Sequence, residues 1–405
     1  EDHRGPLKDH LDCERELARL TELVDAAERV MVFCGRGVAG AHAEVMAFAE
    51  KVKAPVGHAL RGKEHIQYDN PYDVGMSGLL GYGAAYEAMH EADLLLLLGT
   101  DFPYTEFLPR HVRTVQVDVQ PERLGRRTQL DLAVWGDVGE TLRCLTPAVR
   151  EKPSRRFLDR MLERHTHALE GAVNAYTRHV ENQTPIHPEY VAAVLDEEAA
   201  DDAVFTVDTG MCCVWAARYL TPNGRRRILG SFVHGSMANA LPQAIGAQFL
   251  DRGRQVVSLS GDGGFSMLMG DFLTLVQYGL PVKVVVFNNS SLGMVDLEMM
   301  VDGLPPHATS YPHTDYAAIA TAAGARGIRV EKPADLRGAL REAFAHDGPA
   351  LVDVVTDPAA LAVPPKITAE QVSGFALSAS RTVLSGGVGR MLHLARANLR
   401  NVPRP

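Results

Sequence analysis

The sequence predicts an α/β protein with two doubly wound parallel-sheet domains and a C-terminal amphipathic tail. Short β-branched or leucine-rich runs alternate with helical stretches along most of the chain, which is typical of parallel sheets covered by helices. The 405 residues are too many for one ordinary core. A polar stretch at 151–185 separates the two predicted domains, and we expect it to be a linker helix. Together these observations predict five parts, with boundaries at 1–20, 21–150, 151–185, 186–365 and 366–405.

Composition and charge narrow the class of protein. A hydrophobic content of 46% with 22% charged residues is typical of a globular protein. The net charge of −9, from 41 basic and 50 acidic residues, argues against a nucleic-acid binder, because no excess positive charge attracts a phosphate backbone. The five cysteines are scattered without metal-ligand spacing, which indicates a reducing, cytoplasmic compartment. Because the chain begins at Glu1 without an initiator methionine, we expect a linker at 1–20 and a fragment or processed chain.

The first domain is predicted from strand-like runs at 29–34, 55–60, 93–98, 114–119 and 133–134. Turns that follow three strands of this domain indicate a nucleotide, because ligands of open α/β sheets bind beyond the carboxyl ends of the strands. A carboxylate that ends a strand, such as Asp118, is expected to hold an adenosine ribose. From the residues alone, ordinary turns explain these segments equally well. The candidate residues are Ser77, Gly78, Leu79, Leu80, Thr100, Asp101, Phe102, Pro103, Tyr104 and Asp118.

The second domain is organised around residues 261–291. This stretch reads as the end of a strand, a glycine-rich turn, a helix, a β-branched strand and an Asn-Asn turn. In a parallel sheet both strand ends face one crevice, so we expect Asp262 and Asn289 to meet although they are 27 positions apart (289 − 262). A carboxylate and an amide oxygen suit Mg²⁺, and the backbone N–H groups of Gly263 and Gly264 can meet a diphosphate. The glycine-rich turn or the Asn-Asn turn alone would be explained as an ordinary turn. The two together predict a metal–diphosphate site.

The tail at 366–405 differs in charge from the rest of the chain. It carries six basic residues and one acidic residue, a net charge of +5 (6 − 1), and its apolar residues recur at roughly helical spacing. A basic amphipathic segment suits an anionic membrane surface. A C-terminal helix that docks on its own protein explains the same pattern.

The motif Gly-Asp-Gly at 261–263, followed after a gap in the mid-twenties by Asn-Asn at 288–289, resembles the thiamine diphosphate signature of the pyruvate oxidase and acetolactate synthase superfamily. From about 30 to 399 the chain is similar to the FAD-containing, quinone-reducing pyruvate dehydrogenases (bacterial pyruvate oxidases), most clearly at 59–65, 230–239 and 261–271. The resemblance implies that the three strand-end segments of the first domain bind FAD.

The resemblance also assigns residues of the second domain. Asp262, Asn289 and the backbone carbonyl of Ser291 would bind Mg²⁺, and Met237 would support the bent form of thiamine diphosphate. The full set implied for thiamine diphosphate is Gly235, Ser236, Met237, Asp262, Gly263, Gly264, Asn289, Ser290, Ser291, Leu292, Gly293, Met294 and Val295.

The function implied by the resemblance is oxidative decarboxylation of pyruvate, or a similar 2-keto acid, to acetate and CO₂. Electrons would pass through FAD to a membrane quinone, and the enzyme would be a homo-oligomer, a tetramer in the family. The tail would be a conditional membrane anchor, which makes the protein cytoplasmic and peripherally membrane-associated. The glutamate that activates thiamine lies in the family in an N-terminal pyrimidine-binding domain, to which no stretch of this chain can be assigned. An acetolactate synthase-like carboligase with non-redox FAD and a non-catalytic nucleotide- or partner-binding chain are the alternatives.

Overall fold

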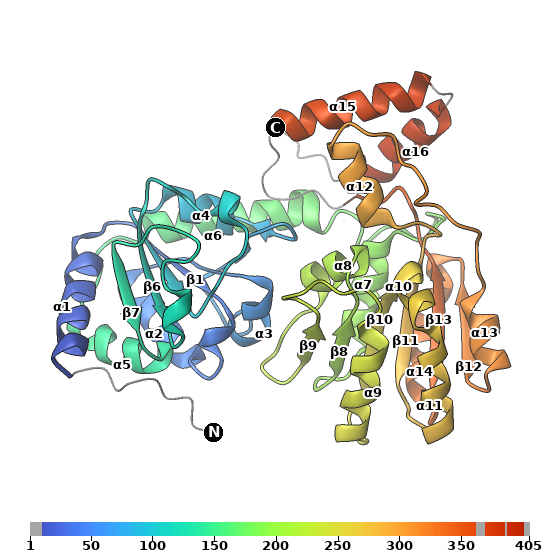
Figure 1. The fold of residues 1–405 in the computed structure, drawn as a ribbon, viewed down its shortest axis with the longest axis horizontal. Coiled ribbons are helices and arrows are strands. Elements are labelled where there is room, and N and C mark those ends of the chain that lie inside the picture. Colours follow the sequence, from blue (N-terminus) through green and yellow to red (C-terminus); the bar gives the residue numbers. More distant parts are fainter. Residues whose placement is uncertain (1–9, 362–368, 385–386, 401–405) are drawn as a thin grey trace. The chain divides into compact units, whose positions relative to one another are not determined.

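The computed structural model describes residues 10–361, 369–384 and 387–400. The chain divides into two compact units, Glu1–Leu169 and Glu170–Pro405 (Figure 1). Each unit is built around one sheet of mostly or entirely parallel strands, so the predicted α/β class with two parallel-sheet domains is confirmed. Two of the six basic residues of the tail, Lys366 and Arg404, lie outside the described residues.

The sheet of the first unit has seven strands in the order β4-β3-β2-β1-β5-β6-β7. All neighbours are parallel except β4, which runs antiparallel to β3 at the edge. The strands are β1 Val30–Cys34, β2 Val56–His58, β3 Asp73–Met76, β4 Tyr82–Gly83, β5 Leu94–Leu98, β6 Arg113–Asp118 and β7 Leu132–Trp135.

Helices cover both faces of this sheet, and β1 shows why the strand sequence is apolar throughout. Val30, Val32 and Cys34 belong to a core formed with α1, α2 and α5, whereas Met31 and Phe33 belong to a second core formed with α4 and α6. Successive side chains of a strand point to opposite faces, so a strand covered twice needs no polar residue. The helices are α1 His10–Ala26, α2 His42–Val52, α3 Lys63–Ile66, α4 Ala85–Glu91, α5 Val138–Ala148 and α6 Arg156–Ala168.

The sheet of the second unit has six parallel strands in the order β12-β13-β11-β10-β8-β9. Gly261 of β10 is opposite Phe287 of β11, and Asn288 of β11 is opposite Val355 of β13. This register brings the carboxyl ends of the central strands to one edge. The strands are β8 Val204–Val207, β9 Arg227–Gly230, β10 Val256–Gly261, β11 Lys283–Asn288, β12 Arg326–Val330 and β13 Ala350–Val355.

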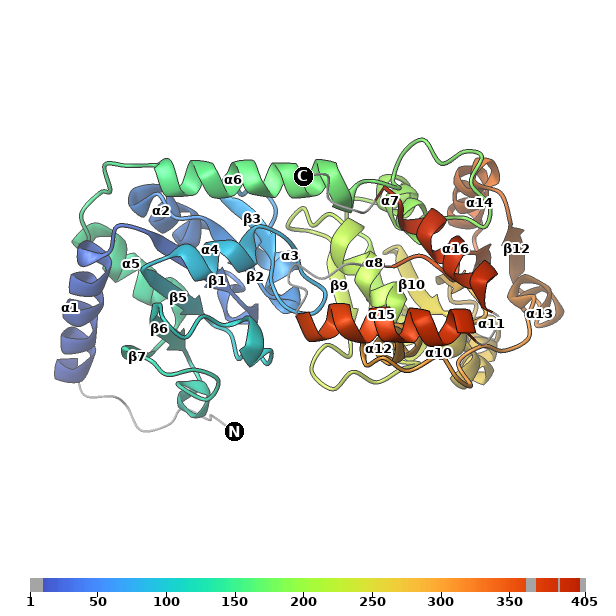
Figure 2. The ribbon, with the colours of Figure 1, turned by 90° about the horizontal axis from the view of Figure 1, so that it is seen from above.

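The helices of the second unit pack on both faces of its sheet. Val284 and Val286 of β11 lie in a core with residues of α9, α10, α11 and α13, and α7 and α14 lie on the other side of the strands (Figure 2). The helices are α7 Pro188–Glu198, α8 Met211–Tyr219, α9 Ala240–Leu250, α10 Asp262–Met267, α11 Phe272–Tyr278, α12 Gly293–Val301, α13 Tyr316–Ala322, α14 Pro333–Ala345, α15 Ala369–Leu384 and α16 Val388–Asn398.

The linker helix is shorter than the sequence-based expectation. It was expected at 151–185, but α6 ends at Ala168 and is followed by a π turn at Leu169–Val173, where Gly171 lowers the helical propensity. In the second unit, α9 begins only at Ala240, because Ala238 adopts a left-handed conformation with φ of 64° that an α-helix cannot contain.

The tail forms two helices, α15 and α16, and α15 contacts α12 (Figure 2). The crossing is close, because a Cβ atom built on Gly374 would lie 1.9 Å from the carbonyl oxygen of Val301. Ser378 donates to the carbonyl of Leu304 at 2.7 Å, and Arg381 donates to the carbonyl of Gly303 at 2.8 Å. The tail is therefore docked on its own protein here. Among the residues with described positions, none of the helices combines the length and apolarity needed to cross a membrane.

Candidate functional site

A cavity of about 520 Å³ opens at the carboxyl ends of β8, β10 and β11 in the second unit. Thr209 and Gly210 follow β8, Asp262 follows β10 and Asn289 follows β11, and all four line the cavity. Every residue that the sequence analysis assigned to thiamine diphosphate lines it except Ser236, whose backbone carbonyl accepts a hydrogen bond from Thr209 at 2.8 Å. The structure thus brings three segments, at 235–237, 262–264 and 289–295, to one cavity.

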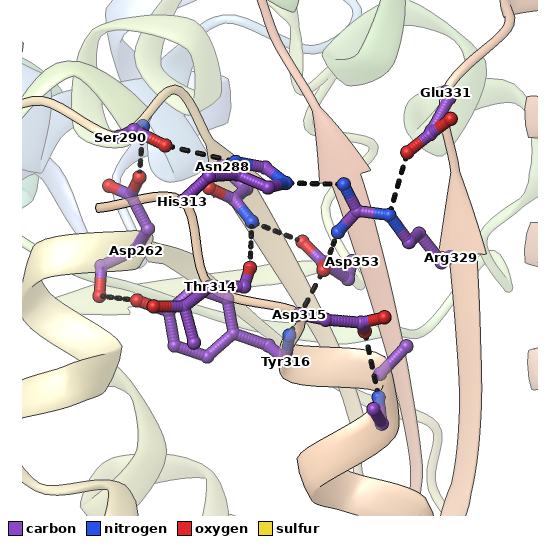
Figure 3. Close-up of polar contacts among 12 residues, drawn as sticks. Asp262, Asn288, Ser290, His313, Thr314, Asp315, Tyr316, Arg329, Glu331 and Asp353 are labelled. Atoms are coloured by element: carbon purple, nitrogen blue, oxygen red, sulfur yellow. Dashed lines mark hydrogen bonds and ion pairs between the residues drawn. The ribbon is translucent and has the colours of Figure 1, made fainter. Parts of the chain in front are cut away.

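Asp262 is buried at the start of α10 and is held by backbone amides. Its Oδ1 accepts from the N–H of Gly263 at 2.9 Å, and its Oδ2 accepts from the N–H of Ser290 at 2.6 Å (Figure 3). Burial raises the pKa of the Asp262 carboxyl above its usual value, against the lowering effect of these amides. Asn289 accepts from the N–H of Ser291 through its Oδ1 at 3.0 Å. The loop after β11 is therefore folded onto the carboxylate that follows β10.

The residues present fit Mg²⁺ and a diphosphate. One carboxylate, one amide oxygen and one backbone carbonyl, from Asp262, Asn289 and Ser291, are hard oxygen ligands that leave other positions of an octahedral ion open. A Cβ atom on Gly263 would lie 2.7 Å from the Cδ2 atom of Leu292 and 3.2 Å from the hydroxyl of Tyr311. The absence of a side chain at this glycine keeps the space between the two loops open.

Asp208, at the end of β8, connects the cavity segments and was not assigned from the sequence. Its side chain is 1% exposed, and its Oδ1 accepts from the N–H groups of Thr209 at 2.9 Å and Asn239 at 3.1 Å and from Nδ2 of Asn239 at 3.0 Å. These bonds tie the loop that carries Met237 to the strand end. Burial raises the pKa of the Asp208 carboxyl to about 6. The Oδ2 atom has no hydrogen-bond partner in the described part of the chain and faces Gly264, on which a Cβ atom would lie 2.0 Å away.

Residues of α16 complete the wall of the cavity. Arg390, His393 and Leu394 line it. The Nη2 atom of Arg390 lies 3.0 Å from the Oδ2 atom of Asp296, and the Nε2 atom of His393 lies 2.8 Å from the Oδ1 atom of Asp357. The docked tail therefore meets the cavity through two polar contacts, which the sequence analysis did not predict because they join residues 94 and 36 positions apart.

The residues assigned to FAD all lie in the first unit, after β3, after β5 and at the end of β6. The first two segments are in contact, because a Cβ atom on Gly78 would lie 3.1 Å from the rings of Phe102 and Tyr104. Asp118 is 2% exposed, and burial raises the pKa of its carboxyl. Its Oδ2 is buried without a hydrogen-bond partner among the described residues. Asp101 instead pairs with two arginines at 3.3 and 3.0 Å.

Three arginines near these segments were missed by the sequence analysis. Arg36 follows β1, Arg61 follows β2 and Arg123 follows β6. The pKa of Arg61 is lowered by its partial burial and further by the positive charges of Arg36 and Arg123. Three cations gathered at the carboxyl edge of the sheet favour an anionic ligand there. Their positions in three separate turns gave no local sequence signal.

Two family profiles match this sequence. The central domain of the thiamine pyrophosphate enzymes matches residues 17–145, and their C-terminal TPP binding domain matches residues 208–354. The putative thiamine pyrophosphate-containing protein YdaP of Bacillus subtilis is 37% identical over 364 residues, which cover 89% of this chain and 62% of that protein.

Other relatives have more specific names. A pyruvate oxidase of Lactiplantibacillus plantarum is 29% identical over 361 residues, covering 87% of this chain and 59% of that protein. A probable acetolactate synthase large subunit of Methanocaldococcus jannaschii is 29% identical over 364 residues, covering 85% and 60%. The chain spans less than two thirds of the length of each of these relatives.

Proposed function

The chain belongs to the thiamine pyrophosphate enzymes, of which it carries the central and the C-terminal domain, and on this premise we propose that it binds thiamine diphosphate with Mg²⁺ and acts on pyruvate or a similar 2-keto acid. One observation carries the proposal: three segments far apart in the sequence, with the Gly-Asp-Gly and Asn-Asn motifs among them, line a single cavity. Relatives named pyruvate oxidase and acetolactate synthase support a 2-keto acid as the substrate class.

Each segment has a distinct task in this proposal. Asp262, Asn289 and the carbonyl of Ser291 hold Mg²⁺, and the loop that Asp208 ties down presents Met237 to the organic part of the cofactor. When bound, thiamine diphosphate supplies a carbon nucleophile for the keto group and an electron sink as CO₂ leaves. The residues of α16 reduce access of water to the cavity while the tail is docked.

We propose an oxidative reaction, from pyruvate to acetate and CO₂, with FAD in the first unit and a quinone as the final acceptor. The contact between the segments at 77–80 and 100–104, the unpartnered oxygen of Asp118 and the three arginines at the same edge support a dinucleotide with a diphosphate. FAD, when bound, accepts two electrons. The sequence resemblance to quinone-reducing pyruvate dehydrogenases favours this reaction over the alternative.

The alternative is carboligation, as in acetolactate synthases, because relatives of that name cover 85% and 84% of the chain, close to the 87% covered by the pyruvate oxidase. The two reactions differ in the fate of the electrons. Pyruvate reduces the flavin in the oxidative reaction and leaves it oxidised in carboligation, where acetolactate accumulates.

Calorimetry and flavin absorbance test the proposal. The full chain should bind thiamine diphosphate in a Mg²⁺-dependent manner, and Asp262→Ala should abolish that binding while any flavin is retained. Asp271→Ala is the matched control, because this aspartate lies nearby in the same unit but does not line the cavity. Unchanged affinity in Asp262→Ala would refute the metal assignment. With the activating glutamate of a pyrimidine-binding domain supplied, anaerobic pyruvate that leaves bound FAD oxidised while acetolactate forms would favour the carboligase.

We further propose that the tail at 366–405 binds an anionic membrane surface. Its described residues expose the apolar side chains of Leu384 (87%), Leu392 (54%) and Leu399 (67%) among several arginines. Each basic residue near an anionic surface contributes about 1 kcal/mol, and apolar side chains buried in the interface add to that. The polar contacts of Arg390 and His393 at the cavity would have to break as the tail moves to a membrane.

A further inference from the structure

Ser290, in the loop after β11, is held in an unfavourable backbone conformation. Its φ of 55° lies in the left-handed region, which residues with a side chain rarely adopt. Its neighbours fix both its backbone and its side chain. The N–H donates to Oδ2 of Asp262 at 2.6 Å, the carbonyl accepts from the N–H of Tyr311 at 3.2 Å, and Oγ lies 3.0 Å from Nδ1 of His313 (Figure 3).

The ring of His313 lies between Ser290 and Arg329. Its Nε2 atom is in hydrogen-bond contact with Nη2 of Arg329. A guanidinium group only donates, so Nε2 must accept, and the proton of the neutral ring is on Nδ1. This Nδ1–H group then donates to Oγ of Ser290. Ser290 therefore does not donate its hydroxyl proton to His313.

Two carboxylates hold Arg329 in place. Its Nη1 donates to Oδ2 of Asp353 at 2.8 Å, and its Nε donates to Oε1 of Glu331 at 2.8 Å. Asp353 is fully buried and also accepts from Nδ2 of Asn288 at 2.8 Å. Residues of three neighbouring strands, β11, β13 and β12, thus orient the guanidinium that sets the tautomer of the histidine.

We infer that His313 is a positioning residue that makes Ser290 a hydrogen-bond donor toward a diphosphate in the cavity. Ser290 lines that cavity, and its oxygen is occupied as an acceptor by His313, so its hydroxyl proton would be left to donate to a phosphate oxygen. A serine without such a partner can rotate its hydroxyl proton freely. The inference rests on the proposed function, because the diphosphate is that of the proposed cofactor.

The first test needs no ligand. Long-range ¹H–¹⁵N spectra of the full chain labelled in histidine distinguish a ring protonated on Nδ1 from one protonated on Nε2. His313 is expected to carry its proton on Nδ1, and its signal is assigned by its loss in His313→Leu. A His313 ring protonated on Nε2 would overturn the inference, because such a ring cannot accept from Arg329 and donate to Ser290.

The second test is a double-mutant cycle with calorimetric affinity for thiamine diphosphate and Mg²⁺ as the readout. Ser290→Gly removes the hydroxyl while tolerating the left-handed backbone, and His313→Leu removes the ring hydrogen bonds. Each change should weaken binding by about tenfold, the usual loss for one hydrogen bond to a charged group. The double variant should bind no more weakly than Ser290→Gly alone, because His313 acts through that hydroxyl.

Two further variants separate positioning from a merely structural role. His313→Asn keeps a donor near the position of Nδ1 and should restore binding to within about threefold of the unchanged chain. His307→Ala, an exposed histidine of the same connecting segment, is the matched control and should bind as the unchanged chain does. Full affinity in His313→Leu, or losses that multiply in the double variant, would overturn the inference alone. A chain that binds no thiamine diphosphate at all would overturn the proposed function and this inference with it.

Discussion

Replacing Asp208 with asparagine should stabilise the second unit at neutral pH but not at pH 4. Burial raises the pKa of the Asp208 carboxyl from 3.8 to about 6, and the side chain is 1% exposed. The folded protein therefore binds this proton more tightly than the unfolded chain does. Stability from this group is fully present below about pH 3.8 and is lost as the pH rises through about 6. The difference in pKa of about 2.2 corresponds to about 3 kcal/mol.

Asparagine is the right substitution because it keeps the hydrogen bonds. Its amide oxygen can accept from the N–H groups of Thr209 and Asn239 as Oδ1 of Asp208 does. Its NH₂ group takes the place of Oδ2, which has no partner among the described residues. Because asparagine does not ionise, the free energy of unfolding of Asp208→Asn relative to the unchanged chain should rise by about 2 to 3 kcal/mol between pH 4 and pH 7.

The assay is urea unfolding of the ligand-free chain at several pH values between 4 and 7. The chain has two tryptophans, one in each unit, so both proteins carry Trp135→Phe and the fluorescence of the buried Trp215 reports the second unit. Asp251→Asn, at an exposed aspartate of the same unit, is the control and should shift stability by less than about 0.5 kcal/mol at every pH. A difference between Asp208→Asn and the unchanged chain that is equal at pH 4 and pH 7 would refute the reasoning.

Three other predictions follow from contacts described above. Gly264→Ala should lower the free energy of unfolding by about 1–3 kcal/mol, because its Cβ would lie 2.0 Å from Oδ2 of Asp208. Gly261→Ala is the control and should change the free energy of unfolding little, because a Cβ there has no atom within 4 Å. Equal unfolding curves for the two variants would contradict the predicted clash. Arg61→Met should reduce the FAD released on denaturation, measured by flavin absorbance, and an unchanged flavin content would exclude this arginine from the site. Deleting 366–405 should remove sedimentation with anionic vesicles, and the membrane proposal fails if the full and shortened chains sediment equally.

The fold class and the segments of the cavity could be predicted because their signals are local. A β-branched run, a glycine turn and a helical stretch identify one βα unit, and the rules of parallel sheets bring the ends of neighbouring strands together. The placement of Asp262 and Asn289 at one cavity needed nothing else. In the turn after β1, Gly35 and Gly37 have a packing role that becomes evident only in the structure. A Cβ atom on Gly37 would lie 2.5 Å from the Cα atom of Gly99.

The supporting contacts could not be predicted, because they depend on register and side-chain direction across strands. Asp208 meets Asn239 only because the loop after β9 returns to the end of β8. Arg329 contacts His313 from β12, an edge strand of the sheet. Neither contact can be predicted from the spacing of the residues in the sequence. The tail is a similar case. Its charge and apolar pattern alone favour a docked helix, whereas the family resemblance favours a membrane anchor, and docking depends on how closely its backbone can approach α12.

The close approach of α15 to α12 depends on one residue, Gly374. Gly374 allows the backbone of α15 to touch the carbonyl of Val301, and a single methyl group there would lie 1.9 Å from that oxygen. Truncating the tail removes both the cover of the cavity and the face that we propose binds a membrane. Gly374→Ala would instead unseat the helices while leaving every charge and every apolar side chain of the tail in place. Gly374→Ala, which adds a single carbon atom, would thus separate access to the cavity from the proposed affinity for a membrane surface.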